Sequence, residues 1–346
     1  MDRTKQNDII RRARAMADKA SFVADDFAQA LFPRTEVVFN DRMRSNARQY
    51  LRGAVSQIEQ RVCQIATRDL GVGQELLLSI AEGGDDQSFA LLQHSGLLNK
   101  PEIVQHLLVK TQQSELAARL LQKISQEDLE STLTRHLDHD DPAVAQAAMG
   151  LLVAQSRATG SAGEIAASLA DLPPEIVYAI VWPVTAALAR LSGVPAVRLQ
   201  QAAERLLAEH DESAAVKRKA ERLAQLLEQT RTETSPASHP MKDGLALFVA
   251  RLARQSGLSS DQIVTFTSEP EMARFVILLR AADYPVEEAL SIYAALDSGD
   301  NILTAATFGE LDRDRSADMV SRWAAPEAYQ NADRILSRDY LGEDRP

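Results

Sequence analysis

The sequence predicts an all-α protein, and three observations point to that class. Hydrophobic residues make up 45% of the 346-residue chain but aromatic residues only 5%, so its cores should be aliphatic. Glycine (15 residues) and proline (13 residues) are too sparse for the many tight turns of a sandwich or barrel. Most segments also repeat apolar residues every three or four positions, which is the period of one buried helix face.

The charge of the chain is unevenly distributed. The net charge is −11, but residues 1–70 carry 13 lysines and arginines against 9 aspartates and glutamates, which leaves −15 on the rest. A nucleic-acid binder needs lysine and arginine to displace phosphate counterions, so nucleic acid is disfavoured as a partner. The basic N-terminal part is either a solvated helical surface or a contact for an acidic partner or a membrane face.

The sequence also indicates a compartment. A single cysteine, Cys63, excludes an intrachain disulfide and favours a reducing environment. The residues before and around Ile9-Ile10 lack the apolar core of a signal peptide. No run reaches the roughly 18 apolar residues of a membrane span, and the most apolar stretch, 176–191, contains Trp182-Pro183 and should be buried. We expect a cytoplasmic protein without a membrane span.

Residues 1–72 are expected to form a long-helix hairpin. Residues 4–32 show one apolar face, either one amphipathic helix or two in series, which Phe32-Pro33 ends. A second helix should follow over 41–70, capped by Asn40 or Asp41.

This second helix should end at Gly71, and its apolar stripe resembles a coiled-coil seam. The stripe comprises Met43, Ala47, Leu51, Ala54, Ile58, Val62 and Ile65, with Tyr50 and Val55 beside it. It predicts either a homodimer through the 41–70 helix or an internal hairpin in which the seam packs on the first helix.

Residues 73–230 read as a domain of short, antiparallel helices. Their expected ranges are 74–81, 85–94, 101–110, 114–124, 126–137, 142–155, 162–169, 174–191 and 195–227. Proline recurs at the first helical position, where its preset φ fits and its missing N–H has no partner to lose. Pro101, Pro142 and Pro174 are 41 and then 32 residues apart, close to the length of a two-helix repeat.

The segment that opens with Asp141-Pro142 resembles the second helix of a HEAT-type repeat. It continues with Val144, Ala147, Ala148 and Leu151 at helical spacing. The order of parts is also similar to an uncharacterised family of HEAT-like helical proteins of alphaproteobacteria, a domain of unknown function. That resemblance covers about 73–300. It implies an irregular HEAT-like α-solenoid with the N-terminal hairpin at one end, but it supplies no activity and no functional residues.

The segment 231–243 has no apolar periodicity and is rich in Ser, Thr, Pro and His. This composition predicts an exposed linker. Residues 244–346 should then form a smaller C-terminal helical domain. Its expected helices are 245–253, 260–266, 271–281, 286–296, 302–308 and 327–337.

One histidine cluster is a candidate metal site. His136 and His139 are three residues apart, with Asp140 beside them, and imidazoles with carboxylates can hold a divalent metal. The His-Asp doublet at 139–140, repeated at 210–211, also occurs in helical metal-dependent phosphohydrolases of HD type. The alternative is structural, because histidine suits the last turn of one helix and aspartate the cap of the next.

A basic flank on the 41–70 helix is a candidate partner site. Arg44, Arg48 and Arg52 lie four residues apart and share one side of the helix. They form a solvated flank, a contact for an acidic protein partner, or a contact for nucleic acid or a membrane.

The function expected from these observations is that of a non-enzymatic adaptor or scaffold, with a helical-repeat groove that binds a protein. The acidic body favours a basic partner, and no cofactor is implied. The alternative is a divergent metal phosphohydrolase that uses His136, His139 and Asp140.

Overall fold

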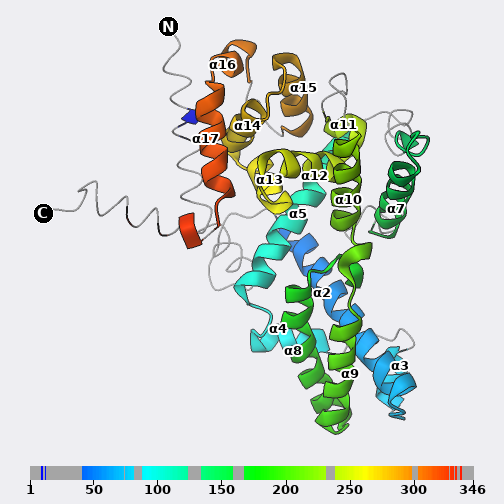
Figure 1. Cartoon of the computed structure of the whole chain (residues 1–346). Helices are drawn as coiled ribbons and strands as arrows, with labels where there is room; N and C mark the ends of the chain where they lie inside the picture. Colours follow the sequence, from blue (N-terminus) through cyan, green and yellow to red (C-terminus); the bar gives the residue numbers. More distant parts are fainter. Residues whose placement is uncertain are drawn as a thin grey trace, which may run out of the picture. The chain divides into compact units, whose positions relative to one another are not determined.

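The computed structural model describes residues 9–10, 12, 41–73, 75–81, 88–123, 134–158, 167–230, 238–297, 303–326, 328–330, 332 and 336. Every regular element in these ranges is helical and none is a strand, which confirms the all-α class (Figure 1). The helix expected at 4–32 lies outside the described residues except for Ile9, Ile10 and Arg12. Most residues of the helices expected at 126–137, 162–169 and 327–337 also lie outside the described residues.

The chain divides into two compact units built from separate segments. Unit 1 comprises Met1–Asp18, Arg119–Arg135 and Ala224–Pro346, and unit 2 comprises Lys19–Ala118 and His136–Leu223. This division differs from the sequential domains 1–72, 73–230 and 244–346, because parts of 73–230 belong to unit 1. Helix α5 (Pro101–Lys123) and helix α10 (Val216–Gln229) each contribute residues to both units.

The long helix of unit 2 forms as the sequence predicts. Helix α2 spans Asp41–Gln64 and continues as a π-helical turn over Ile65–Asp69. Gly71 then adopts a φ of 67°, which ends the helix at the predicted residue. The N–H of Val72 closes this end by donating to the carbonyl of Ala66 at 3.0 Å.

The apolar stripe of α2 is buried within its own chain. Except for the half-buried Met43, every stripe residue named above is at most 3% exposed. The helix packs against α3 (Glu75–Ala81), α4 (Ser88–Ser95), α8 (Pro174–Ser192) and α9 (Ala196–Glu209) (Figure 1). These helices cover the seam within the chain.

Two predicted helix boundaries in unit 2 are wrong. The ranges 101–110 and 114–124 form the single helix α5, because the intervening Thr-Gln-Gln contains no helix breaker and the Thr111 hydroxyl donates to the carbonyls of Leu107 and Leu108. The range 195–227 instead forms two helices, α9 and α10. They separate at Asp211, whose carboxylate accepts from the N–H of Ser213 at 2.8 Å and starts a short 3-10 turn.

Helix α8 is a central element of the unit 2 core, and it continues through Pro183. Proline has no N–H, so the carbonyl of Ala179 one turn earlier has no helical partner. The ammonium of Lys100 lies 3.5 Å from that oxygen and donates to it. Of the described helices, α8 alone has the length and composition of a membrane span, and 56% of its apolar stretch is buried in the protein.

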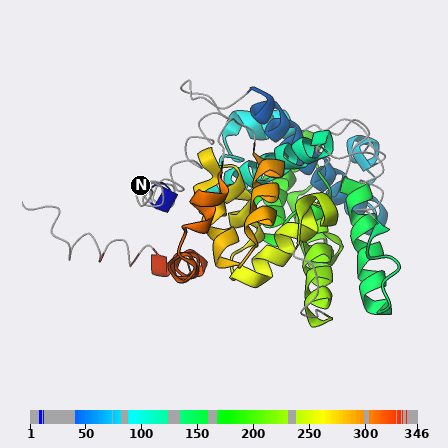
Figure 2. The ribbon, with the colours of Figure 1, turned by 90° about the horizontal axis from the view of Figure 1, so that it is seen from above.

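Helix α7 (Pro142–Ala158) completes the described helices of unit 2 and opens at the predicted proline. Unit 1 gathers shorter helices after residue 238 (Figures 1 and 2). These are α11 (Pro240–Asp243), α12 (Leu245–Ser256), α13 (Ser260–Thr267), α14 (Ala273–Ala281), α15 (Val286–Leu296), α16 (Ala305–Gly309) and α17 (Arg313–Ala324).

Three features of unit 1 differ from expectation. Residues 238–243, assigned to a linker, instead contain α11, and Ser238 and Asp243 are buried. The range 271–281 is broken at its start, since Glu271 and Met272 have φ values of 63° and 46°. Helix α17 is not among the expected helices. Its sequence is strongly charged, and Met319, Val320 and Trp323 lie on its buried face.

Candidate functional site

The structure places the predicted histidine cluster at the entrance to α7. The Nδ1 atom of His139 accepts a hydrogen bond from the N–H of Asp141 at 3.0 Å, and the Asp141 carboxylate caps Ala143 at 2.8 Å. His136 is half-buried and Asp140 is exposed. No group of three or more His, Cys, Asp or Glu side chains in the described ranges is placed to hold a metal ion. The local geometry is that of a helix cap.

The predicted basic flank lies on the outer side of α2. Arg44 forms an ion pair with Asp41 in the preceding turn, and Arg48 and Arg52 are exposed. The three arginines therefore share one side of the helix as the spacing predicts.

The lone cysteine is a buried structural thiol. Burial, together with the nearby carboxylate of Glu59, raises the pKa of Cys63 to about 12, so the thiol stays protonated at neutral pH. Glu59 is itself buried, and its carboxylate accepts from the N–H of Ser88 at 3.2 Å, the first residue of α4.

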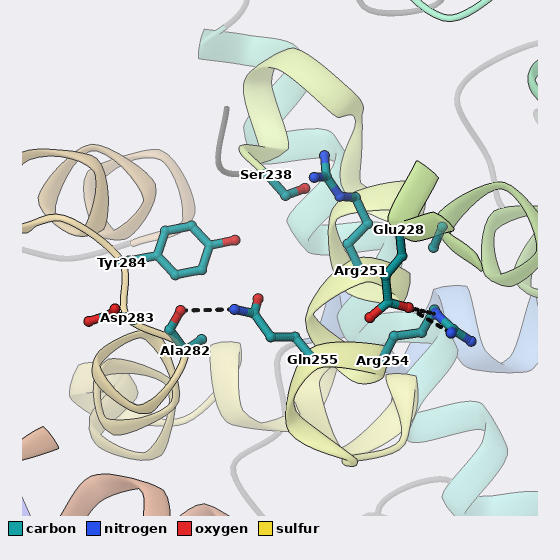
Figure 3. Close-up of a pocket in the computed structure, with 9 residues that line it drawn as sticks. Glu228, Ser238, Arg251, Arg254, Gln255, Ala282, Asp283 and Tyr284 are labelled. Carbon is teal, nitrogen blue, oxygen red and sulfur yellow. Dashed lines mark hydrogen bonds and ion pairs between the residues drawn. The ribbon is translucent and has the colours of Figure 1, made fainter. Parts of the chain in front are cut away.

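A polar pocket in unit 1 is the candidate small-molecule site (Figure 3). Its cavity measures about 90 Å³, well above the roughly 15 Å³ that admits one water molecule. The lining comes from the end of α10, from the segment that leads into α11, from α12 and from the turn after α14. The lining residues are Ala224, Glu228, Ser238, Arg251, Arg254, Gln255, Ala282, Asp283 and Tyr284.

Short polar contacts hold this lining in place. Two nitrogens of Arg254 donate to one oxygen of Glu228, at 2.7 and 2.6 Å. The Gln255 amide donates to the carbonyl of Ala282 at 2.9 Å, which ties α12 to the turn that carries Tyr284. In Figure 3 the Tyr284 ring points across the cavity toward Arg251 and Ser238.

A buried carboxylate supports one wall of the pocket. The side chain of Asp243 is 3% exposed and pairs with Arg251 at 3.2 Å and with Arg135 at 3.5 Å. It also accepts from the Ser238 hydroxyl at 2.7 Å and from the N–H of His239 at 3.2 Å. A buried charge with this many donors is well compensated, so Asp243 fixes Arg251 and Ser238 in place.

A serine and a histidine beside this carboxylate do not form a nucleophilic triad. The Nδ1 atom of His239 accepts from the N–H of Met241 at 3.1 Å, so the ring proton is on Nε2. That proton points to the Ser291 hydroxyl 3.2 Å away, and His239 therefore cannot accept the serine proton. Burial, and then Lys242, lower the pKa of His239 and keep the ring neutral.

A second surface lies in unit 2, on the outward face of α8. Tyr178 is 60% exposed and meets Trp182, one turn later, edge to face, with ring centroids 6.2 Å apart. Helix α4 packs against α8 and exposes Leu91 (41%), and the turn after it exposes Leu97 (47%).

Sequence reasoning did not identify either surface. The pocket draws on residues from 224 to 284 without a motif, and one of them, Ser238, lies in the segment that the sequence predicts to be a linker. Tyr178 and Trp182 stand in the most apolar stretch of the chain, which was expected to be buried. The four-residue spacing of two aromatics on one helix was the available signal. Comparisons with protein-family models, with curated proteins and with solved structures find no match to this chain.

Proposed function

We propose that this protein is an adaptor that binds a partner protein and has no catalytic activity of its own. The observation that carries the proposal is the outward face of α8, where the 60% exposed Tyr178 stands against Trp182. Aromatic side chains of this size dominate binding energy at protein interfaces, and their exposure costs solubility when nothing covers them.

The partner that fits this face best presents a basic segment with apolar side chains. Residues 71–346 carry a net charge of −15. Glu175 is exposed on the same face of α8, one turn before Tyr178. Opposite charges around an apolar contact raise the association rate and select the partner, while the aromatic pair supplies most of the affinity.

A photo-crosslinking amino acid in place of Tyr178 tests this proposal inside cells. We expect it to capture a protein of net positive charge, whose binding to the purified chain weakens with added salt. The same crosslinker at Tyr329, an exposed tyrosine of unit 1, is the matched control. Equal capture at both positions, or no capture at position 178, would overturn the proposal.

A further inference from the structure

The pocket of unit 1 presents hydrogen-bond donors on one wall and acceptors on another. Arg251 uses only Nη1 to bind Asp243, and no described residue bonds to its Nε or Nη2. Glu228 uses only Oε2 for Arg254, and Gln255 uses its Nε2 for Ala282. The Oε1 atoms of Glu228 and Gln255 are therefore open acceptors among the described residues.

The side chains in Figure 3 surround one space. Tyr284 and Ser238 border it together with Arg251, while Gln255 and Glu228 border it from the side of Ala282 and Arg254. The unused donors therefore lie on the Arg251 side and the unused acceptors on the side of Glu228 and Gln255, where the Arg254 guanidinium is already paired with Glu228.

The charges on the lining balance. Arg251 and Arg254 contribute two positive charges, and Glu228 and Asp283 contribute two negative charges. Each is also in an ion pair: Arg254 with Glu228, Arg251 with Asp243 and Asp283 with Arg313. A simple anion would meet Glu228 and a simple cation would meet Arg251, so each would be repelled by one wall. A neutral molecule with a negative and a positive end would satisfy both walls.

The cavity has room for a small molecule. Its volume of about 90 Å³ is several times the roughly 15 Å³ that admits one water molecule. We propose that the pocket binds a small α-amino acid as its zwitterion. The carboxylate contacts Arg251, and the ammonium contacts the Oε1 atoms of Glu228 and Gln255. This site is separate from the α8 face and does not depend on the adaptor function.

Calorimetric titration of the full chain with glycine and with L-alanine tests the site directly. Acetate and methylammonium, which carry one charged end each, are the comparison probes. We expect saturable binding of at least one amino acid, with both single-ended probes at least roughly tenfold weaker, since each lacks one charge-assisted contact. Failure of both amino acids to bind at millimolar concentration, or acetate that binds equally well, would overturn the proposal.

The Glu228→Gln variant separates the two walls. It should weaken amino-acid binding roughly tenfold or more while acetate binds as before or more tightly, because a repulsive charge is removed. Asp318→Asn makes the same chemical change at an exposed ion pair of unit 1 and should leave both affinities unchanged. If Glu228→Gln does not fold, as judged by circular dichroism, Gln255→Leu removes the other acceptor and should weaken amino-acid binding alone. Unchanged amino-acid affinity in a folded variant contradicts the assignment.

Discussion

At the scale of single residues, the interior of unit 2 depends on polar contacts that correct local defects. Lys100 is one example, because its ammonium donates to the Ala179 carbonyl that Pro183 leaves without a helical partner. Such a correction cannot be predicted from sequence, since Lys100 and Ala179 are far apart in the chain. The apolar stripe of α2 could be predicted, because burial on one helix face repeats at a fixed spacing.

Replacing Lys100 with methionine should lower the free energy of unfolding by about 1 kcal/mol, since a partly buried carbonyl loses its donor. Urea denaturation measures this change. In a Pro183→Ala background the restored N–H can bond to Ala179, so the same replacement should cost less. Equal costs in the two backgrounds would show that Lys100 does not serve this carbonyl.

His106 gives unit 2 a dependence on acid. Its Nε2 lies 3.3 Å from the Tyr50 hydroxyl, and burial, followed by Lys110 and Lys217, lowers its pKa to about 3. The unfolded chain therefore binds a proton below about pH 6.5 that the folded chain does not. Stability should fall as pH drops from 6.5 toward 3, by at most roughly 1.4 kcal/mol per pH unit from this group.

Urea denaturation at several pH values checks this dependence. The His106→Gln variant has no titrating group at this position and should lose less stability between pH 6.5 and pH 4. A variant that is as sensitive to acid as the parent chain would assign the effect to other groups.

At the scale of helices, the sequence predicted that a helix exists more reliably than it predicted the residues where the helix begins and ends. Proline in the first turn marked the starts of α7 and α8, and Gly71 marked the end of the helical stretch that begins with α2. Polar residues caused two opposite errors in the predicted boundaries: one polar run does not end a helix, and one aspartate does. The Thr-Gln-Gln run within α5 is compatible with a helix, so α5 continues through it. The Asp211 side chain instead binds a backbone N–H group and separates α9 from α10.

Basic side chains also stabilise helix ends from a distance. Lys123 donates to the carbonyls of Ala294, Ala295 and Asp297 at 2.8, 3.1 and 3.1 Å, which satisfies the end of α15. The Lys123→Met variant should lower stability by about 1–2 kcal/mol and speed hydrogen exchange in the last turn of α15. Arg322→Met, which removes an exposed intrahelical pair, is the control and should change neither. Unchanged exchange in α15 would contradict the capping role.

At the scale of the whole molecule, the sequence could not predict which segments assemble. Apolar periodicity shows that a helix has a partner but does not identify it, so a sequential reading assigned neighbouring segments to one domain. Which separated segments belong to one unit can be learned only from the three-dimensional contacts between them. The pocket was missed for the same reason, because its residues become neighbours only when α10, α12 and the turn after α14 meet.

The proposed adaptor function depends on partner binding at the α8 face. The most direct measurement is the equilibrium affinity of the crosslinked partner for the wild-type chain and for its Tyr178→Ser variant, with Tyr329→Ser as the matched control. We expect the Tyr178 variant to bind roughly thirtyfold more weakly, since truncating a hot-spot aromatic costs about 2 kcal/mol. The control should bind as the wild type does. Equal affinity of all three proteins would contradict the claim.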